Sequence, residues 1–158
     1  MKSDPKIIDM LQEVLKAELT AINQYFLHAE MCENWGYEAL AKHTRKESIE
    51  EMRHAESLME RILYLDGTPT MTELFKINVG ANVEQQMKND LELEYTAVKR
   101  LNGFIHTASQ LNDAGTRELF EHILTDEEQH IDYLEAQLHA VKEMGIANYL
   151  AQQLKGDD

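Results

Sequence analysis

The chain has 158 residues, 43% of them hydrophobic, a size and composition that suit one domain with a buried core. Its 29 acidic residues against 15 basic ones give a formal net charge of −14, which argues against a nucleic-acid partner because phosphates would be repelled. Cys32 is the single cysteine and the N-terminus MKSDPKIIDM lacks an apolar signal core, so we expect a protein of the reducing cytoplasm with no membrane partner.

Helical segments dominate the predicted structure, because apolar residues recur at three- and four-residue spacing and the chain has only 2 Pro and 7 Gly. Asp4 and Pro5 are typical of an N-cap and a first helical turn, and the stretch Asp66-Gly67-Thr68-Pro69 is typical of a helix end. We therefore expect one all-α domain over residues 1–158, with helices at about 4–35, 37–65, 83–111, 114–143 and 146–154.

The connections between these helices differ in length. The first and second helices, and the third and fourth, are joined by a few residues each, which predicts two antiparallel hairpins. The connection over 66–82 could span roughly 55 Å at about 3.3 Å per residue. Because a helix of about 28 residues is only about 42 Å long, this segment can cross the length of a bundle.

One pattern of glutamate and histidine occurs twice in the chain. A glutamate is followed 33 residues later by a Glu-x-x-His tetrapeptide, and the second copy lies 76 residues after the first. On a helix, a Glu and a His three residues apart project from one face, so each tetrapeptide can offer a carboxylate and an imidazole to one ion. Four carboxylates and two imidazoles suit two divalent irons or manganeses. The six candidate ligands are Glu18, Glu51, His54, Glu94, Glu127 and His130.

An acidic, solvated surface is the simpler interpretation of a single Glu-x-x-His. With 7 His and many glutamates, about one such tetrapeptide is expected by chance. Chance does not supply the matched spacing of the two copies, nor the repeat of Thr20-Ala21 after Glu18 as Thr96-Ala97 after Glu94. The paired pattern therefore favours a two-metal site.

The chain resembles bacterioferritins over essentially its whole length, notably in ELTAINQYFLHAEMCENWG around Glu18 and SIEEMRHAESLMERIL around His54. This resemblance implies a ferritin-like four-helix bundle with one long crossover and a short fifth C-terminal helix. It also implies a hollow shell of twenty-four subunits built from dimers. In such a shell Fe(II) is oxidised by O2 or H2O2 at a ferroxidase site in each subunit and stored as ferric mineral.

The resemblance also gives roles to individual residues. The six candidate ligands match the family's six ferroxidase ligands, and Glu51 and Glu127 match its two bridging carboxylates. Tyr25 matches the tyrosine that lies beside the di-iron centre, where it would donate an electron or a hydrogen bond.

A haem site is the second cofactor site that the resemblance implies. At about 100° per residue, Met52 lies on the face of its helix that points away from Glu51 and His54. In bacterioferritins two such methionines, one from each subunit of a dimer, ligate a shared haem b, and a ferredoxin is the expected reductant. A packing role for Met52, one of 8 methionines, is the alternative. Other outward-facing residues expected near this haem are Leu19, Asn23, Phe26 and Arg45.

The chain departs from the family pattern on the face expected to line the iron cavity. Some members have a His and an Asp, forming an inner-surface iron site, where this chain has Lys46 and Glu50. A protonated lysine cannot ligate a metal, so the sequence does not predict that site here. The remaining histidines lack an acidic residue three positions earlier and are expected to be surface or packing residues: His28, His43, His106, His122 and His139.

Two other functions fit parts of the pattern. One is a haem-binding electron-transfer cage with a vestigial metal site, which the presence of all six ligands disfavours. The other is a rubrerythrin-like di-iron peroxidase, which generally carries a cysteine-rich module that a chain with one Cys lacks. The sequence leaves open whether the shell is mixed with a second subunit type, how much haem it holds, which oxidant it prefers, and whether it serves storage or detoxification.

Overall fold

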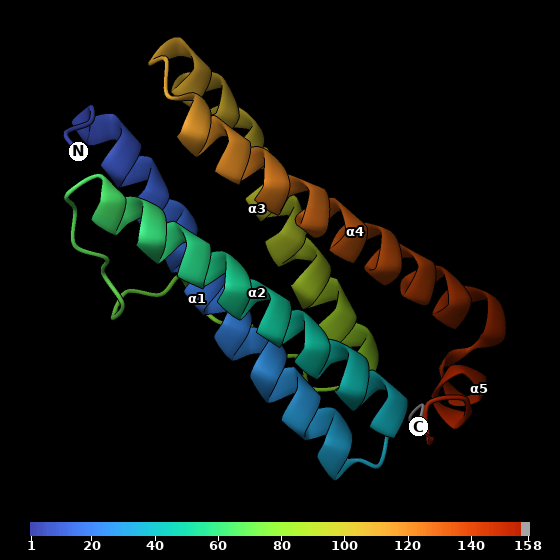
Figure 1. Ribbon diagram of the computed structural model, residues 1–158. Helices are drawn as coiled ribbons and strands as arrows, with labels where there is room; N and C mark the ends of the chain where they lie inside the picture. Colours follow the sequence, from blue (N-terminus) through green and yellow to red (C-terminus); the bar gives the residue numbers. More distant parts are fainter. Residues whose placement is uncertain (156–158) are drawn as a thin grey trace.

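A computed structural model describes residues 1–155 of the chain, and these residues form helices and no strands. Four long helices lie side by side and a short fifth helix follows at the C-terminal end (Figure 1). This architecture confirms the predicted all-α bundle. The last helix is shorter than predicted, because it ends at Ala151 and not at residue 154. The helices are α1 (Pro5–Asn34), α2 (Glu38–Tyr64), α3 (Val83–Gln110), α4 (Ala114–Met144) and α5 (Ile146–Ala151).

Short polar residues start three of the long helices. Asp4 accepts a hydrogen bond from the Lys6 backbone N–H at 2.9 Å, and Pro5 occupies the first turn of α1. Asn82 and Asp113 accept equivalent bonds at the starts of α3 and α4. Each bond satisfies a backbone donor that the first helical turn leaves without a partner.

The two tight links between neighbouring helices depend on left-handed backbone conformations. Gly36, at φ 87°, turns the chain from α1 into α2, and Asn112, at φ 57°, turns it from α3 into α4. Glycine and asparagine adopt this region at low cost, so both links stay only a few residues long. The two hairpins, α1 with α2 and α3 with α4, pack against each other as the bundle.

The apolar core is divided into two clusters along the bundle. One cluster includes Leu11, Leu58 and Phe120 and lies toward the start of α1. The other includes Cys32, Leu134 and Tyr149 and lies toward the end of α1. Buried polar side chains occupy the bundle between them. The middle of the bundle is therefore polar, with an apolar cluster on either side of it.

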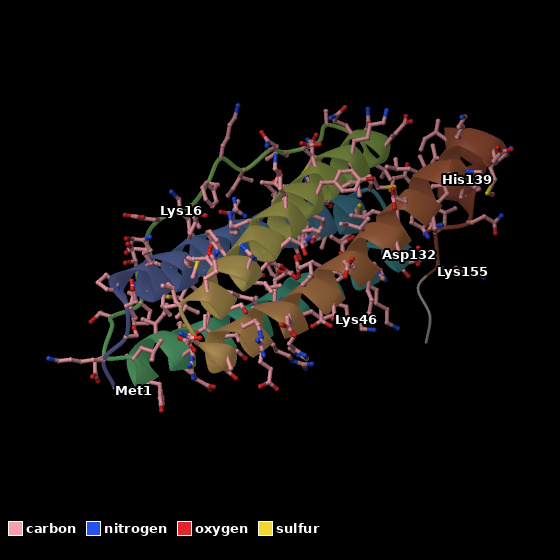
Figure 2. All side chains as sticks on the ribbon, turned by 90° about the horizontal axis from the view of Figure 1, so that it is seen from above. Met1, Lys16, Lys46, Asp132, His139 and Lys155 are labelled. Atoms are coloured by element: carbon pink, nitrogen blue, oxygen red, sulfur yellow. The ribbon has the colours of Figure 1, made fainter. Side chains whose placement is uncertain are left out.

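The segment between α2 and α3 runs along the outside of the bundle as the predicted crossover (Figure 1). Side chains of α1 bind its backbone at successive points: Thr20 Oγ1 accepts from Phe75 N at 2.9 Å, Gln24 Oε1 from Asn78 N at 3.0 Å, and Gln12 Oε1 from Thr70 N at 2.9 Å. These bonds fix the irregular segment against α1 at three points along its length. In Figure 2 the crossover and Lys46 lie on opposite sides of the bundle.

The fifth helix docks on its own chain. Tyr149 is only 2% exposed, and its hydroxyl donates to Gln137 Oε1 at 2.5 Å. A backbone bond from Ala39 N to Gln153 O, at 3.1 Å, ties the residues after α5 to the start of α2. Within the part of the chain that the structure describes, no helix combines the length and apolarity needed to cross a membrane.

Candidate metal centre

All four long helices contribute to one buried group of carboxylates and imidazoles. Glu18 comes from α1 and Glu94 from α3, while α2 and α4 each supply a Glu-x-x-His tetrapeptide. Each of the six residues is at most 5% exposed, and the structure brings them together inside the bundle. The six residues are Glu18, Glu51, His54, Glu94, Glu127 and His130.

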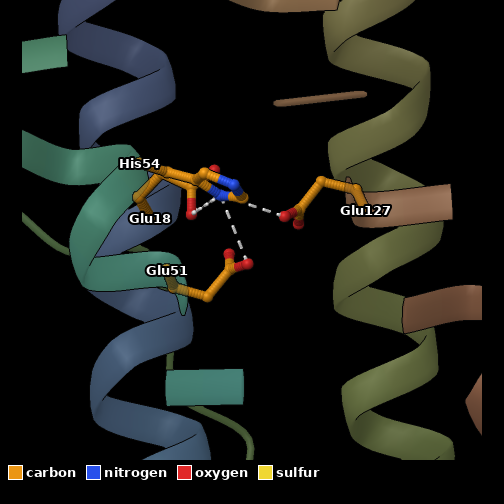
Figure 3. A group of neighbouring side chains, drawn as sticks. All are labelled: Glu18, Glu51, His54 and Glu127. Carbon is orange, nitrogen blue, oxygen red and sulfur yellow. Dashed lines mark ion pairs between the residues drawn. The ribbon is translucent and has the colours of Figure 1, made fainter. Parts of the chain in front are cut away.

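The first of two four-residue groups surrounds His54 (Figure 3). His54 Nδ1 lies 3.3 Å from Glu127 Oε1, 3.5 Å from Glu51 Oε1 and 3.6 Å from Glu18 Oε2. One ligand atom from each of the four residues lies within 4.8 Å of the others, a spread that one metal ion can bridge.

The second group surrounds His130 in the same way. His130 Nδ1 is 3.4 Å from both Glu94 Oε1 and Glu51 Oε1, and 3.9 Å from Glu127 Oε1. Glu51 and Glu127 therefore belong to both groups, while Glu18 and Glu94 each belong to one. The geometry is that of two adjacent ion sites that share two carboxylates.

Five of the six residues have one buried polar atom that lacks a hydrogen-bond partner among the described residues. A buried polar atom without a partner costs about 1–3 kcal/mol, and a buried charge costs more. A bundle that needed these residues only for packing would gain nothing from them. Hard oxygen donors and imidazole nitrogens facing one another without partners fit bound divalent cations. The unpartnered atoms are Glu18 Oε2, Glu51 Oε1, His54 Nδ1, Glu94 Oε2 and Glu127 Oε1.

Burial and the charges of the neighbouring side chains shift the pKa values of this group. Burial, followed by the charge of Glu127, raises the pKa of Glu51 and the pKa of Glu94 well above the ordinary value. Burial alone would lower the pKa of His54, but the adjacent carboxylates of Glu127 and Glu18 raise it to about 11. Burial opposes the same shift at His130, where Glu94 raises the pKa to about 10. The group therefore holds protons at neutral pH that a cation would displace.

Tyr25 lies against the second group. Its side chain is fully buried, and its hydroxyl donates a hydrogen bond to Glu94 Oε1. Burial, and then the charge of Glu94, raises the pKa of this tyrosine well above its ordinary value, so the hydroxyl keeps its proton. The structure thus places Tyr25 beside the six candidate ligands.

The residues predicted to surround a haem lie apart from this group. Met52 on α2 and Phe26 on α1 are 42% and 45% exposed, and Asn23 on α1 is exposed too. Leu19 is half-buried and packs against the first apolar cluster. Arg45 bonds to Glu30 at 2.7 Å and to Glu33 at 3.4 Å on α1. Met52 is thus directed away from the buried carboxylates.

Sequence reasoning did not select two further buried carboxylates beside the group. Glu47 is 5% exposed and bonds to His43 Nε2 at 2.5 Å, and Asp90 is 6% exposed and bonds to His28 Nδ1 at 2.9 Å. Glu47 lies four residues before Glu51, and Asp90 lies four residues before Glu94. Residues four positions apart lie on the same face of a helix, so their spacing from the selected ligands could have identified both carboxylates from the sequence.

Comparisons with known proteins agree with this geometry. Residues 8–144 match the family model described as a ferritin-like domain. The chain is 48% identical over 152 residues to a bacterioferritin of Mycolicibacterium paratuberculosis, covering 96% of each chain. It is 48% identical to a bacterioferritin of Streptomyces coelicolor, covering 96% of this chain and 90% of the relative, and 40% identical to one of Brucella melitensis, covering 94% and 92%. With a ferritin-like bundle, two adjacent carboxylate and histidine groups, and this identity over almost its full length, the chain belongs to the bacterioferritin family.

Proposed function

We propose that the protein stores iron and acts as a ferroxidase, oxidising Fe(II) at the buried group of six residues. The observation that carries the proposal is the sharing of Glu51 and Glu127 between two four-residue groups, each completed by one histidine and one further glutamate. Two adjacent sites let two Fe(II) ions be oxidised together, so one oxidant molecule can take two electrons at once.

The donor set supports binding of Fe(II) as substrate. Four carboxylates carry about the charge of two divalent ions, so a filled site avoids the cost of an unbalanced buried charge. Carboxylate oxygens are hard donors that favour Fe(III) over Fe(II), and they therefore lower the energy needed to remove an electron from each iron. O2 or H2O2 is the proposed oxidant, and Tyr25 is the proposed neighbour that donates an electron or a hydrogen bond.

Assembly and haem binding complete the proposal. The expected product is ferric mineral held in a cytoplasmic shell of twenty-four subunits, built from dimers of this chain alone or with a second subunit type. The exposed Met52 supports axial ligation of a haem b shared across the dimer, with Leu19, Asn23, Phe26 and Arg45 around it. A thioether is a soft ligand that favours reduced haem iron, which suits release of stored iron by a ferredoxin reductant.

The deciding experiment compares two neighbouring glutamates on α4. Glu127→Gln removes a shared carboxylate, while Glu128→Gln changes an exposed residue of the same helix. We would add two Fe(II) per subunit to each protein without oxygen, admit O2, and follow ferric absorbance in a stopped-flow instrument.

A fast phase that saturates near two irons per subunit in the wild type and in Glu128→Gln, and that is lost in Glu127→Gln, is the expected result. Equal slow oxidation in all three proteins would contradict the ferroxidase proposal. If haem were bound normally in that case, the haem-binding electron-transfer cage would be the better interpretation.

A further inference from the structure

In each histidine of the metal centre, the ring nitrogen that faces away from the shared glutamates contacts a carboxylate outside the six proposed ligands. His54 Nε2 lies 2.7 Å from Asp126 Oδ2, and His130 Nε2 lies 2.8 Å from Glu50 Oε2. Both contacts run between α2 and α4. Both histidines thus turn one ring nitrogen toward the shared glutamates and the other toward a carboxylate on the facing helix.

These contacts are reciprocal in the sequence. Asp126 immediately precedes Glu127, and Glu50 immediately precedes Glu51. The acidic residue before each shared glutamate therefore binds the histidine of the other tetrapeptide. Two residues next to each other on a helix point about 100° apart, so a carboxylate beside a buried ligand can reach around the ring of the opposite histidine.

The hydrogen bonds determine which nitrogen is free for a metal. An ionised carboxylate only accepts hydrogen bonds, so the proton in each contact is carried by Nε2. The lone pair of a neutral ring then lies on Nδ1, which in both histidines faces the shared glutamates. Without this partner, the ring is free to carry its proton on Nδ1, or to rotate so that Nδ1 no longer faces the shared glutamates.

Asp126 and Glu50 lie between the buried centre and solvent. Asp126 is 34% exposed and Glu50 is 35% exposed, while the histidines that they bind are 6% exposed. Both carboxylates line a cavity of about 310 Å³ together with Arg53, His122 and Gln129. Each carboxylate is therefore open to solvent on one side and contacts a buried ring on the other.

We propose that Asp126 and Glu50 are positioning residues, each fixing the orientation and proton position of the opposite histidine so that Nδ1 faces the metal centre. This inference rests on the proposed metal centre and deepens it, because it assigns each half of the centre its own support. Asp126 serves the half that contains Glu18 and His54, and Glu50 serves the half that contains Glu94 and His130.

Anaerobic titration of the metal-free protein with Co(II), followed by its visible absorption, tests the proposal without iron chemistry. Removing a carboxylate that orients a metal-binding histidine typically weakens metal affinity by about 10–100-fold. The wild type is expected to bind two Co(II) per subunit. Asp126→Ala and Glu50→Ala should each keep one tight site and weaken the other by about that factor.

Three further variants separate positioning from a general structural effect. Asp126→Glu keeps a carboxylate and should restore most of the affinity, and the exposed Glu128→Gln should bind as the wild type does. In a His54→Ala background, Asp126→Ala should have no further effect, because the residue through which it acts is gone.

The outcomes distinguish the inference from the proposed function. A wild type that fails to bind two Co(II), or an unaffected Glu127→Gln, would overturn the metal centre and the inference together. Two normal sites in Asp126→Ala and Glu50→Ala would overturn the inference alone. Loss of a third Co(II) in Asp126→Ala, or a full effect in the His54→Ala background, would show that Asp126 binds a separate cation, and would also overturn it.

Discussion

Tyr25 on α1 donates a hydrogen bond to Glu94 on α3 inside the bundle, and so joins the two hairpins at the candidate metal centre. Glu94 Oε1 also lies 3.4 Å from His130 Nδ1, so one oxygen faces both a hydroxyl and a ring nitrogen. The tyrosine thereby limits the orientations open to a proposed metal ligand.

Tyr25→Phe should leave the stoichiometry near two metals per subunit but weaken the half of the centre that contains Glu94. A hydrogen bond to a charged group contributes about 1.5–3 kcal/mol, so we expect about tenfold or greater loss of affinity at that half. Anaerobic Co(II) titration measures the affinity, and stopped-flow oxidation then shows whether the hydroxyl also affects the rate. Unchanged affinity at both halves would contradict an orienting role for Tyr25.

Glu51→Gln should make the metal-free protein more stable while abolishing tight metal binding. Glu51 is 1% exposed with one unpartnered oxygen, and burial together with the neighbouring carboxylates raises its pKa, so the folded protein buries this ionisable group at a free-energy cost that a neutral amide avoids. Relief of this cost is worth roughly 1–4 kcal/mol of unfolding free energy.

Thermal unfolding of the metal-free proteins by circular dichroism measures this gain. The control is Glu56→Gln, an exposed glutamate on the same helix, which should change stability by no more than about 0.5 kcal/mol. A less stable metal-free Glu51→Gln protein would mean that the carboxylate supports the fold, and would contradict the interpretation of this group as a metal centre.

The stability of the metal-free protein should fall as the pH rises from about 6 to 9. The folded pKa of His54, about 11, lies above its unfolded value, so the stabilisation it supplies is complete below the unfolded pKa and is lost as pH approaches 11. The raised pKa of Glu51 acts in the same direction, because the folded state holds more protons than the unfolded state. Denaturant unfolding at several pH values measures how steeply the free energy of unfolding falls with pH. This fall should be smaller in Glu51→Gln.

Metal loading should release protons and remove most of this pH dependence. With His54 and His130 protonated at pH 7, and with the pKa values of Glu51 and Glu94 also raised, we expect at least two protons per subunit to leave when two Co(II) bind. Calorimetry in buffers of different ionisation enthalpy counts these protons. Loading without net proton release would contradict the protonation state described for the metal-free centre.

Met52→Leu should abolish haem binding and leave iron oxidation intact. Leucine keeps the apolar surface of this 42%-exposed side chain but removes the thioether that would ligate haem iron. Absorption spectra of protein reconstituted with haem b, together with stopped-flow oxidation, test the two functions separately. Met59→Leu, at a half-buried methionine of the same helix, is the matched control. Normal haem binding by Met52→Leu would favour the packing interpretation of Met52.

Deleting the chain from Gly145 onward should weaken assembly. The deletion uncovers the apolar cluster on which the buried Tyr149 packs, and it removes the exposed Ile146 and Leu154, which are available for contacts between subunits. Light scattering and size-exclusion chromatography measure shell formation, and circular dichroism checks that the four long helices remain. An intact shell of the shortened chain would contradict this role for α5.

Local sequence patterns were enough to predict most of the fold. The starts of α3, α4 and α5 agree with the predicted positions, because caps such as Asn82 and Asp113 and the turn at Gly145 act within a few residues. The end of α5 was predicted wrongly at residue 154. Its apolar stripe continues to Leu154, but the chain turns after Ala151 and bonds through Gln153 to the start of α2.

The sequence by itself determined the helices, the hairpins and the set of six candidate ligands, because helical periodicity and the repeated 33-residue spacing are local or regular properties of the chain. Only the tertiary structure decided which donors face one another, which atoms lack partners, and which carboxylates hold His54 and His130. The contacts of Asp126 with His54 and of Glu50 with His130 join residues 72 and 80 positions apart. Such pairs depend on how four helices are rotated against one another in the packed bundle, and no pattern within a single helix specifies that rotation.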